Sequence, residues 1–258
     1  MADSPQIAPS AQAPVVVAAR EVHGRPRMLG AAGRRRGWMG RQVCRADWLL
    51  PLPDEVRSEV LAVVARLREA PLPVLLRRPD QFALPACGTL VADVRRRLTG
   101  GLGLVVLDRL PLEDWSTDEA AAVHWVLGQL LAPAVATKWD GTMLYDVTDT
   151  GRRPGPGVRG SATGAELAFH TDNAFGLAVP DYVGLLCVHS AADGGVSRFC
   201  SLYEVHERMR VRHPDLLRRL YQPVYIDRQA EHAPSAPALL WARGKNLSCS
   251  MADLCPAG

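Results

Sequence analysis

The chain has 258 residues and a net charge of +3, with 48% hydrophobic and 22% charged residues. That length allows one sizeable domain with a buried core, and the composition excludes disordered and fibrous classes. The basic residues are almost all arginine, with Lys138 and Lys245 as the two lysines. Their densest run, residues 34–36, indicates a solvated tail rather than a nucleic-acid surface, which would spread charge along a face with interleaved aromatic residues.

Cysteine usage and the first residues bear on the compartment. The six cysteines form no CxxC pair, which argues against a zinc ribbon or a redox dithiol and favours reduced thiols. Residues 1–19 lack a basic n-region, and their apolar run is too short for a signal or membrane helix. We therefore expect a cytoplasmic protein with neither a membrane nor a nucleic-acid partner.

Residues 1–46 are rich in Ala, Pro, Gly and Arg without an apolar period, so we expect a disordered extension followed by one domain over 47–258. A helix is predicted from Asp54 to just before Pro71, because apolar residues recur there at helical spacing. We expect this stripe to pack on a sheet. Its members are Val56, Val60, Val63, Val64 and Leu67.

Two capping boxes predict further helices. Ser116 and Glu119 open a helix that ends at Pro133, and Ser201 and Glu204 open one that runs towards residue 212. The first helix has an apolar face, beside which His124 and Trp125 are interpreted as packing residues. That face consists of Val123, Val126, Leu127, Leu130 and Leu131. A third helix is expected from residue 213, with Leu216, Leu217 and Leu220 facing inward.

Short runs of branched apolar residues predict strands at 101–108, 142–147 and 183–189. Residues 150–164 are rich in glycine, proline and arginine, which predicts a loop that closes over a substrate. Because helices and strands do not alternate regularly, the pattern favours an α+β or mainly β architecture over a doubly wound sheet.

A histidine and an aspartate stand two residues apart in the segment Ala-Phe-His170-Thr-Asp172-Asn173. That spacing places both side chains on one face of an extended chain. An imidazole and a carboxylate are two thirds of the 2-His-1-carboxylate triad that holds non-haem Fe(II). A structural pair between His170 and Asp172 is the alternative, because an HxD motif arises often by chance.

Two features follow this motif: a proline-led apolar run at residues 180–187, and the sequence Gly194-Gly195-Val-Ser197. In order and spacing, the chain over about residues 48–230 resembles the taurine-dioxygenase-like (TauD/TfdA) family of Fe(II)- and 2-oxoglutarate-dependent dioxygenases. The glycine pair has a structural purpose, since it permits a tight turn.

The resemblance implies a double-stranded β-helix, that is, a cupin-like jelly roll decorated with helices. It implies that His170 and Asp172 bind Fe(2+), and that Ser197 hydrogen-bonds a carboxylate of 2-oxoglutarate. Asn173 is placed to reach substrate or cosubstrate, with a turn-stabilising role as an equal alternative. The implied reaction is the oxidation of a small-molecule substrate by O2, with decarboxylation of 2-oxoglutarate to succinate.

The family's third ligand, a histidine on a late strand followed by an arginine, is not recognisable, so we expect a domain that is incomplete at its C-terminus. The substitute that the sequence offers is His232 with Arg243, although the Ala/Pro-rich segment after His232 predicts no strand to hold it. The alternative function is therefore an inactive family member that acts as a binding protein or is a remnant. Association into a homo-oligomer is left open.

Overall fold

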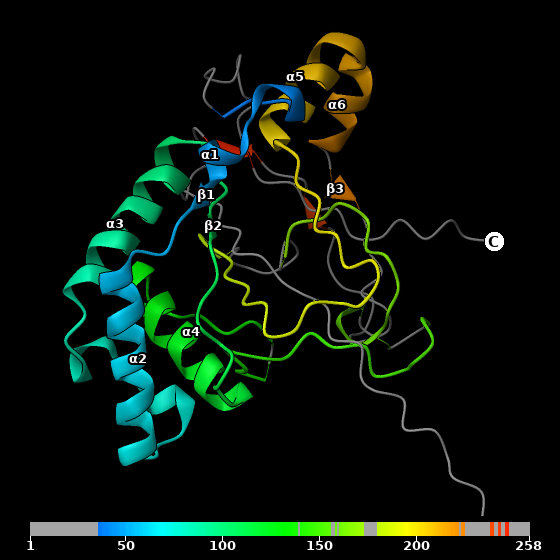
Figure 1. Cartoon of the computed structure of the whole chain (residues 1–258). Helices are drawn as coiled ribbons and strands as arrows, with labels where there is room; N and C mark the ends of the chain where they lie inside the picture. The colour runs from blue at the N-terminus through cyan, green and yellow to red at the C-terminus, as the bar shows by residue number, and fades with distance from the viewer. Residues whose placement is uncertain are drawn as a thin grey trace, which may run out of the picture.

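The structure is a computed structural model that describes residues 36–138, 140–155, 158, 160–172 and 180–221. It also describes the backbone of four two-residue strands after residue 222. Helices α2, α3 and α4 pack together on one side of the molecule, and the α5–α6 hairpin stands apart from them (Figure 1). Irregular chain, green to yellow in Figure 1, runs between these two groups.

Helix α2 (Asp54–Glu69) agrees with the prediction in its bounds and in its buried face. All five residues of the predicted stripe are buried. Asp54 and Glu55 lie in its first turn, where acidic side chains stabilise the positive end of the helix dipole. The stripe, however, packs on α3 and α4, so the expectation that it faces a sheet is wrong.

The reason is α3 (Pro85–Gly100), a helix that sequence analysis missed. Its buried side chains recur at helical spacing, and Pro85 occupies the first turn, where its missing N–H is not needed. The N–H groups of Ala86 and Cys87 each donate to the Glu59 carboxylate of α2 at 2.8 Å, so one helix caps the next. The buried set is Cys87, Leu90, Val91, Val94 and Leu98.

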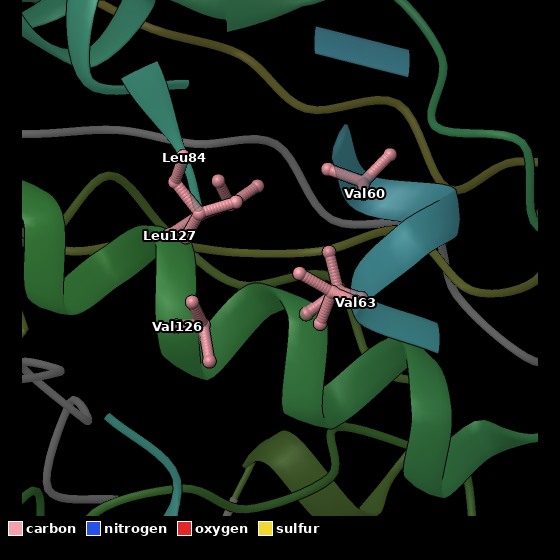
Figure 2. A pocket seen from close by; sticks show the side chains of 6 residues that line it. Val60, Val63, Leu84, Val126 and Leu127 are labelled. Atoms are coloured by element: carbon pink, nitrogen blue, oxygen red, sulfur yellow. The ribbon is translucent and has the colours of Figure 1, made fainter. Parts of the chain in front are cut away.

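Helix α4 (Thr117–Leu131) confirms its predicted capping box, since Ser116 Oγ accepts from the Glu119 N–H and Glu119 accepts from the Ser116 N–H. Val123 and Val126 are buried, and the predicted leucines of this face are partly buried against the same core. In Figure 2, Val60 and Val63 of α2 face Leu84, Val126 and Leu127 across a pocket. The gap among these apolar side chains does not admit a water molecule, so it is a packing seam and not a ligand site.

Strands are shorter than predicted. β1 (Leu49–Leu50) pairs in parallel with β2 (Val106–Leu107), which is the end of the predicted 101–108 strand. The predictions at 142–147 and 183–189 are wrong, because these residues are irregular except for an isolated bridge at Val183. A short apolar run becomes a strand only where another strand supplies the hydrogen-bond partners.

Helices α5 (Leu202–Arg212) and α6 (Pro214–Leu220) form a hairpin. Ser201 Oγ accepts from the Glu204 N–H as predicted, but the Glu204 carboxylate pairs with Arg208 rather than completing the box. On α6, Leu217 is buried, whereas the prediction that Leu216 faces inward is wrong because it is exposed. After α6, two antiparallel pairs of two-residue strands form, β3 (Pro223–Val224) with β4 (Ala238–Leu239) and β5 (Ala242–Arg243) with β6 (Asn246–Leu247).

The described chain begins at Arg36, ahead of the predicted domain start at 47. Arg36 donates to the Thr99 carbonyl at 2.7 Å, and Trp38 Nε1 donates to the Leu102 carbonyl at 3.0 Å. Short helices η1 (Gly40–Gln42) and α1 (Arg45–Trp48) follow. These contacts attach residues 36–48 to the C-terminal end of α3, so the folded part extends further towards the N-terminus than composition indicates.

The described residues thus combine helices with two-residue strand pairs, and no double-stranded β-helix is formed within them. The jelly roll that the resemblance implies stays a prediction. What the fold provides is a helical platform of α2, α3 and α4, beside which the motif-bearing segments lie.

Candidate metal and cosubstrate site

His170 and Asp172 lie side by side, with His170 Nε2 3.3 Å from Asp172 Oδ1. Both side chains are partly exposed, at 40% and 52%. Two ligands that are each about 2.1 Å from a first-row metal and at right angles to one another lie about 3 Å apart. The observed separation therefore fits neighbouring positions on one cation, and the exposure leaves room for further ligands.

The orientation of the His170 ring is set by its other nitrogen. Nδ1 lies 2.8 Å from the Ala168 carbonyl oxygen. A carbonyl oxygen only accepts, so Nδ1 carries the proton and, in the neutral ring, Nε2 presents a lone pair towards Asp172. Metal-binding histidines commonly use this arrangement, in which a backbone carbonyl holds the second nitrogen. If Nε2 is protonated instead, the same geometry is an ion pair.

A third ligand is not found beside this pair in the described part of the chain, where no three His, Cys, Asp or Glu side chains gather as a metal site. His189 and His213 are exposed, and His206 is buried in α5 beside Tyr221. The predicted residues Asn173 and His232 lie outside the described residues. Of Arg243, the structure describes the backbone, in β5.

The glycine pair before Ser197 has a backbone conformation that favours glycine. Gly194 and Gly195 have φ of 71° and 66°, in the left-handed region that glycine adopts at no steric cost. Val196, beyond the pair, is exposed. The positive φ values agree with the choice of glycine at both positions, but no strands flank the pair, so the predicted strand-joining turn is not formed. The Ser197 side chain is exposed.

An ion pair links the segment that follows the glycine pair to the HxD segment, with Arg198 Nη1 3.1 Å from Glu166 Oε1. Arg198 directly follows Ser197, and Glu166 lies four residues before His170. The structure therefore brings the two predicted motifs to one region. Sequence analysis missed this pair, because two charges 32 residues apart carry no local signal.

The motif-bearing chain is attached to the helical platform at residues 182–184. Tyr182 packs on the apolar core, and the His124 ring of α4 lies against Gly184. Burial lowers the pKa of His124, opposed by a hydrogen bond with the Gly184 backbone. The interpretation of His124 as a packing residue agrees with this contact, as does that of Trp125, which is buried and donates to the Arg77 carbonyl at 3.0 Å.

Of the loop predicted at 150–164, the described residues are irregular apart from the short helix η4 (Gly160–Ala162). Its two ends are tied together, because the Thr148 N–H donates to the Ser161 carbonyl and the Thr150 N–H to the Ala162 carbonyl, both at 3.1 Å. A loop whose ends are held together can keep its tip beside a site. Its closure over a substrate stays a prediction.

None of the helices in the described part of the chain combines the length and the apolar character that crossing a bilayer requires.

A family model described as "Taurine catabolism dioxygenase TauD, TfdA family" matches residues 70–243. FR-33289 synthase of Streptomyces rubellomurinus (strain ATCC 31215) is 30% identical over 223 residues, covering 83% of this chain and 64% of the relative. The chain thus spans less than two thirds of that relative's length.

Proposed function

The chain belongs to the TauD/TfdA family of dioxygenases, and from that premise we propose that it is an Fe(II)- and 2-oxoglutarate-dependent oxygenase acting on a small molecule. The observation that carries the proposal is the geometry of His170 and Asp172, whose Nε2 and Oδ1, two atoms of the kinds that bind metals, lie 3.3 Å apart. The Nδ1 contact with the Ala168 carbonyl supports it, because it turns Nε2 towards the shared ligand position.

His170 and Asp172 would hold Fe(II). With 2-oxoglutarate and O2 also bound, that metal would supply the oxidising chemistry for decarboxylation of the cosubstrate to succinate. The carbonyl of Ala168 keeps the imidazole in its metal-binding orientation. Ser197 would donate a hydrogen bond to a carboxylate of 2-oxoglutarate, and Asn173 would contact substrate or cosubstrate.

The relative is named as a synthase of FR-33289. A small-molecule substrate for this chain is part of the proposal. The cytoplasmic location, the jelly-roll core and a third ligand such as His232 belong to the same proposal. Homo-oligomer formation would be compatible with it.

A second function is an inactive family member that binds a ligand without turnover. It is favoured by the absence of a third ligand among the described residues around His170 and Asp172. Two protein ligands hold Fe(II) far more weakly than three, so this reading predicts neither tight iron binding nor succinate formation.

Anaerobic titration of the purified chain with Fe(II) and 2-oxoglutarate separates these functions. We expect a visible charge-transfer band, its loss in His170→Ala and Asp172→Ala, and an unchanged band in His189→Ala, which replaces an exposed histidine outside the pair. Melting temperatures should agree within error across the variants, because exposed ligands add little packing. A folded wild-type chain without the band would refute the oxygenase function.

Ser197→Ala gives a graded test of the cosubstrate role. It removes one hydrogen bond to a charged acceptor, which contributes about 1 to 3 kcal/mol, and leaves both metal ligands in place. The band should therefore still form, at a higher 2-oxoglutarate concentration. Equal 2-oxoglutarate affinity in wild type and variant would rule out the Ser197 contact.

A further inference from the structure

We propose that Leu167 is a positioning residue for His170, because its side chain packs on Gly160 and thereby fixes the backbone that orients the imidazole ring. For its consequence, metal affinity, the inference rests on the proposed function, whereas the packing and the ring orientation do not depend on it. Leu167 is otherwise unexplained, since it is a large apolar side chain, 49% exposed, just ahead of the candidate metal pair.

The contact between Leu167 and Gly160 is close. A Cβ added at Gly160 would lie 2.5 Å from Leu167 Cδ2, 3.6 Å from Cγ and 3.8 Å from Cδ1. The isobutyl group of Leu167 thus occupies the space that a side chain at position 160 would need. Gly160 does not have the positive φ that would itself favour glycine, so the contact with Leu167 accounts for a glycine at this position.

Gly160 is a firm support because hydrogen bonds fix the backbone around it. Its carbonyl accepts from both the N–H and the Oγ1 hydroxyl of Thr163, each at 3.1 Å, and Thr163 is buried. Helix η4, which Gly160 opens, is in turn tied to residues 148–150 by two backbone hydrogen bonds. Leu167 therefore packs on a segment that two separate parts of the chain hold in place.

The route from Leu167 to His170 is short. The residue after Leu167, Ala168, carries the carbonyl oxygen that lies 2.8 Å from His170 Nδ1. Because each peptide unit is planar, the direction of that carbonyl depends on the backbone dihedral angles of Leu167 and Ala168. Packing that holds Leu167 in place therefore narrows the directions in which the carbonyl points. It thus keeps the proton on Nδ1 and the Nε2 lone pair towards Asp172.

The packing is too exposed to contribute much to folding. Leu167 is about half exposed and lies outside the apolar core. A matched control is Leu75, a 52% exposed leucine on the short helix η2 (Val74–Leu76), which packs on α4. Leu167→Ala and Leu75→Ala should therefore have similar melting temperatures, both near that of the wild type. A positioning role predicts a change at the metal pair without a matching change in stability.

The experiment compares Leu167→Ala, Leu167→Met and Gly160→Ala with the wild type and with Leu75→Ala. The first readout is the tautomer of the neutral His170 ring in the metal-free protein, from long-range proton–nitrogen NMR at about pH 8. The signal is identified by its absence in His170→Gln. We expect the Nδ1-protonated form in the wild type and a shift towards the Nε2-protonated form in Leu167→Ala and Gly160→Ala. Leu167→Met should resemble the wild type, because it keeps the apolar volume.

The second readout is Fe(II) affinity, measured anaerobically on the same proteins. Removing a direct hydrogen-bond partner of a metal-binding histidine costs about 10- to 100-fold in affinity. Leu167 acts through Ala168, and His170 has further interactions, so we expect a smaller loss, about three- to tenfold, in Leu167→Ala and Gly160→Ala. In the Leu167→Ala background, Gly160→Ala should cost nothing more, since the side chain that it would displace is gone.

Several results would overturn the positioning role. They are an unchanged His170 tautomer or unchanged Fe(II) affinity in Leu167→Ala, and an equal affinity loss in Leu75→Ala or Leu167→Met. A full further loss from Gly160→Ala in the Leu167→Ala background would exclude the packing contact as the cause. A wild-type chain that does not bind Fe(II) would refute the oxygenase function instead, while the tautomers alone would still decide whether Leu167 orients His170.

Discussion

The motif-bearing chain contacts α4 where Gly184 lies against the His124 ring. The substitution Gly184→Ala adds one methyl group at this contact and so tests it. A Cβ added at Gly184 would lie 3.2 Å from His124 Cε1 and 3.6 Å from Nε2. The Gly184 backbone is not in the left-handed region, so Gly184→Ala acts through this contact alone.

The expected magnitude follows from how far the ring must move. A separation of 3.2 Å requires the ring to shift by a few tenths of an ångström, which corresponds to the low end of overpacking costs, about 1 kcal/mol. For a domain of this size that lowers the melting temperature by about 2–4 °C. Urea unfolding at pH 7.5, followed by circular dichroism, measures the free energy directly.

Two controls make the result specific. The first control is Gly128→Ala on α4, the helix that carries His124, where nothing lies within 4 Å of the added Cβ. It should leave stability unchanged or raise it, because alanine favours helix. In a His124→Ala background, Gly184→Ala should cost nothing, since the ring it would meet is gone. An equal loss in both backgrounds would refute the contact as the cause.

Two further predictions concern partly buried polar contacts. In Glu59→Gln, one of the two N–H groups of Ala86 and Cys87 loses its acceptor, so urea unfolding at pH 7 should show a loss of about 1–2 kcal/mol. Burial opposes ionisation of Glu59, but the two N–H donors outweigh it and lower its pKa. Its contribution to stability is therefore fully present above pH 4.5 and decreases as pH falls through the lowered pKa, and a variant difference that grows below pH 4.5 would contradict this. The second prediction concerns His206, whose Nε2 lies 2.7 Å from the Tyr221 hydroxyl and whose pKa is lowered by burial. As pH drops below 6.5, the histidine of the unfolded chain becomes protonated before that of the folded chain, so stability should fall. His206→Gln should weaken that pH dependence between pH 7 and 5, and a slope equal to the wild type's would contradict a buried neutral ring.

The helices were predictable where their signals are local. The stripe of α2 and the capping box of α4 each lie within one element, and both were confirmed. The α3 helix was missed because it opens with Pro85 and contains glycine and a run of three arginines, which obscure its apolar period. Its N-terminal donors are capped by Glu59 from another helix, and no pattern within α3 itself reveals that partner.

The strand predictions were wrong because strand formation depends on partners that are distant in the sequence. Residues 142–147 and 183–189 have the composition of strands, yet the structure leaves them irregular. Composition measures how well a segment would fit a sheet, whereas a ladder needs a second segment in register. Leu49 and Val106 meet that condition across more than fifty residues, and nothing in either run foretells the pairing.

The same difference between local and distant signals applies to the candidate site. His170 and Asp172 are two residues apart, so the spacing alone predicted that both side chains would lie on one face of the chain, and the 3.3 Å separation agrees. Any further contribution has to come from distant chain, as Arg198 reaching Glu166 illustrates. A facial triad needs three protein ligands, and the HxD pair would supply two of them. The two local ligands are therefore readable from three consecutive residues, 170–172. Whether this chain turns over substrate depends on the third ligand, and the Fe(II) titration tests whether a competent site forms.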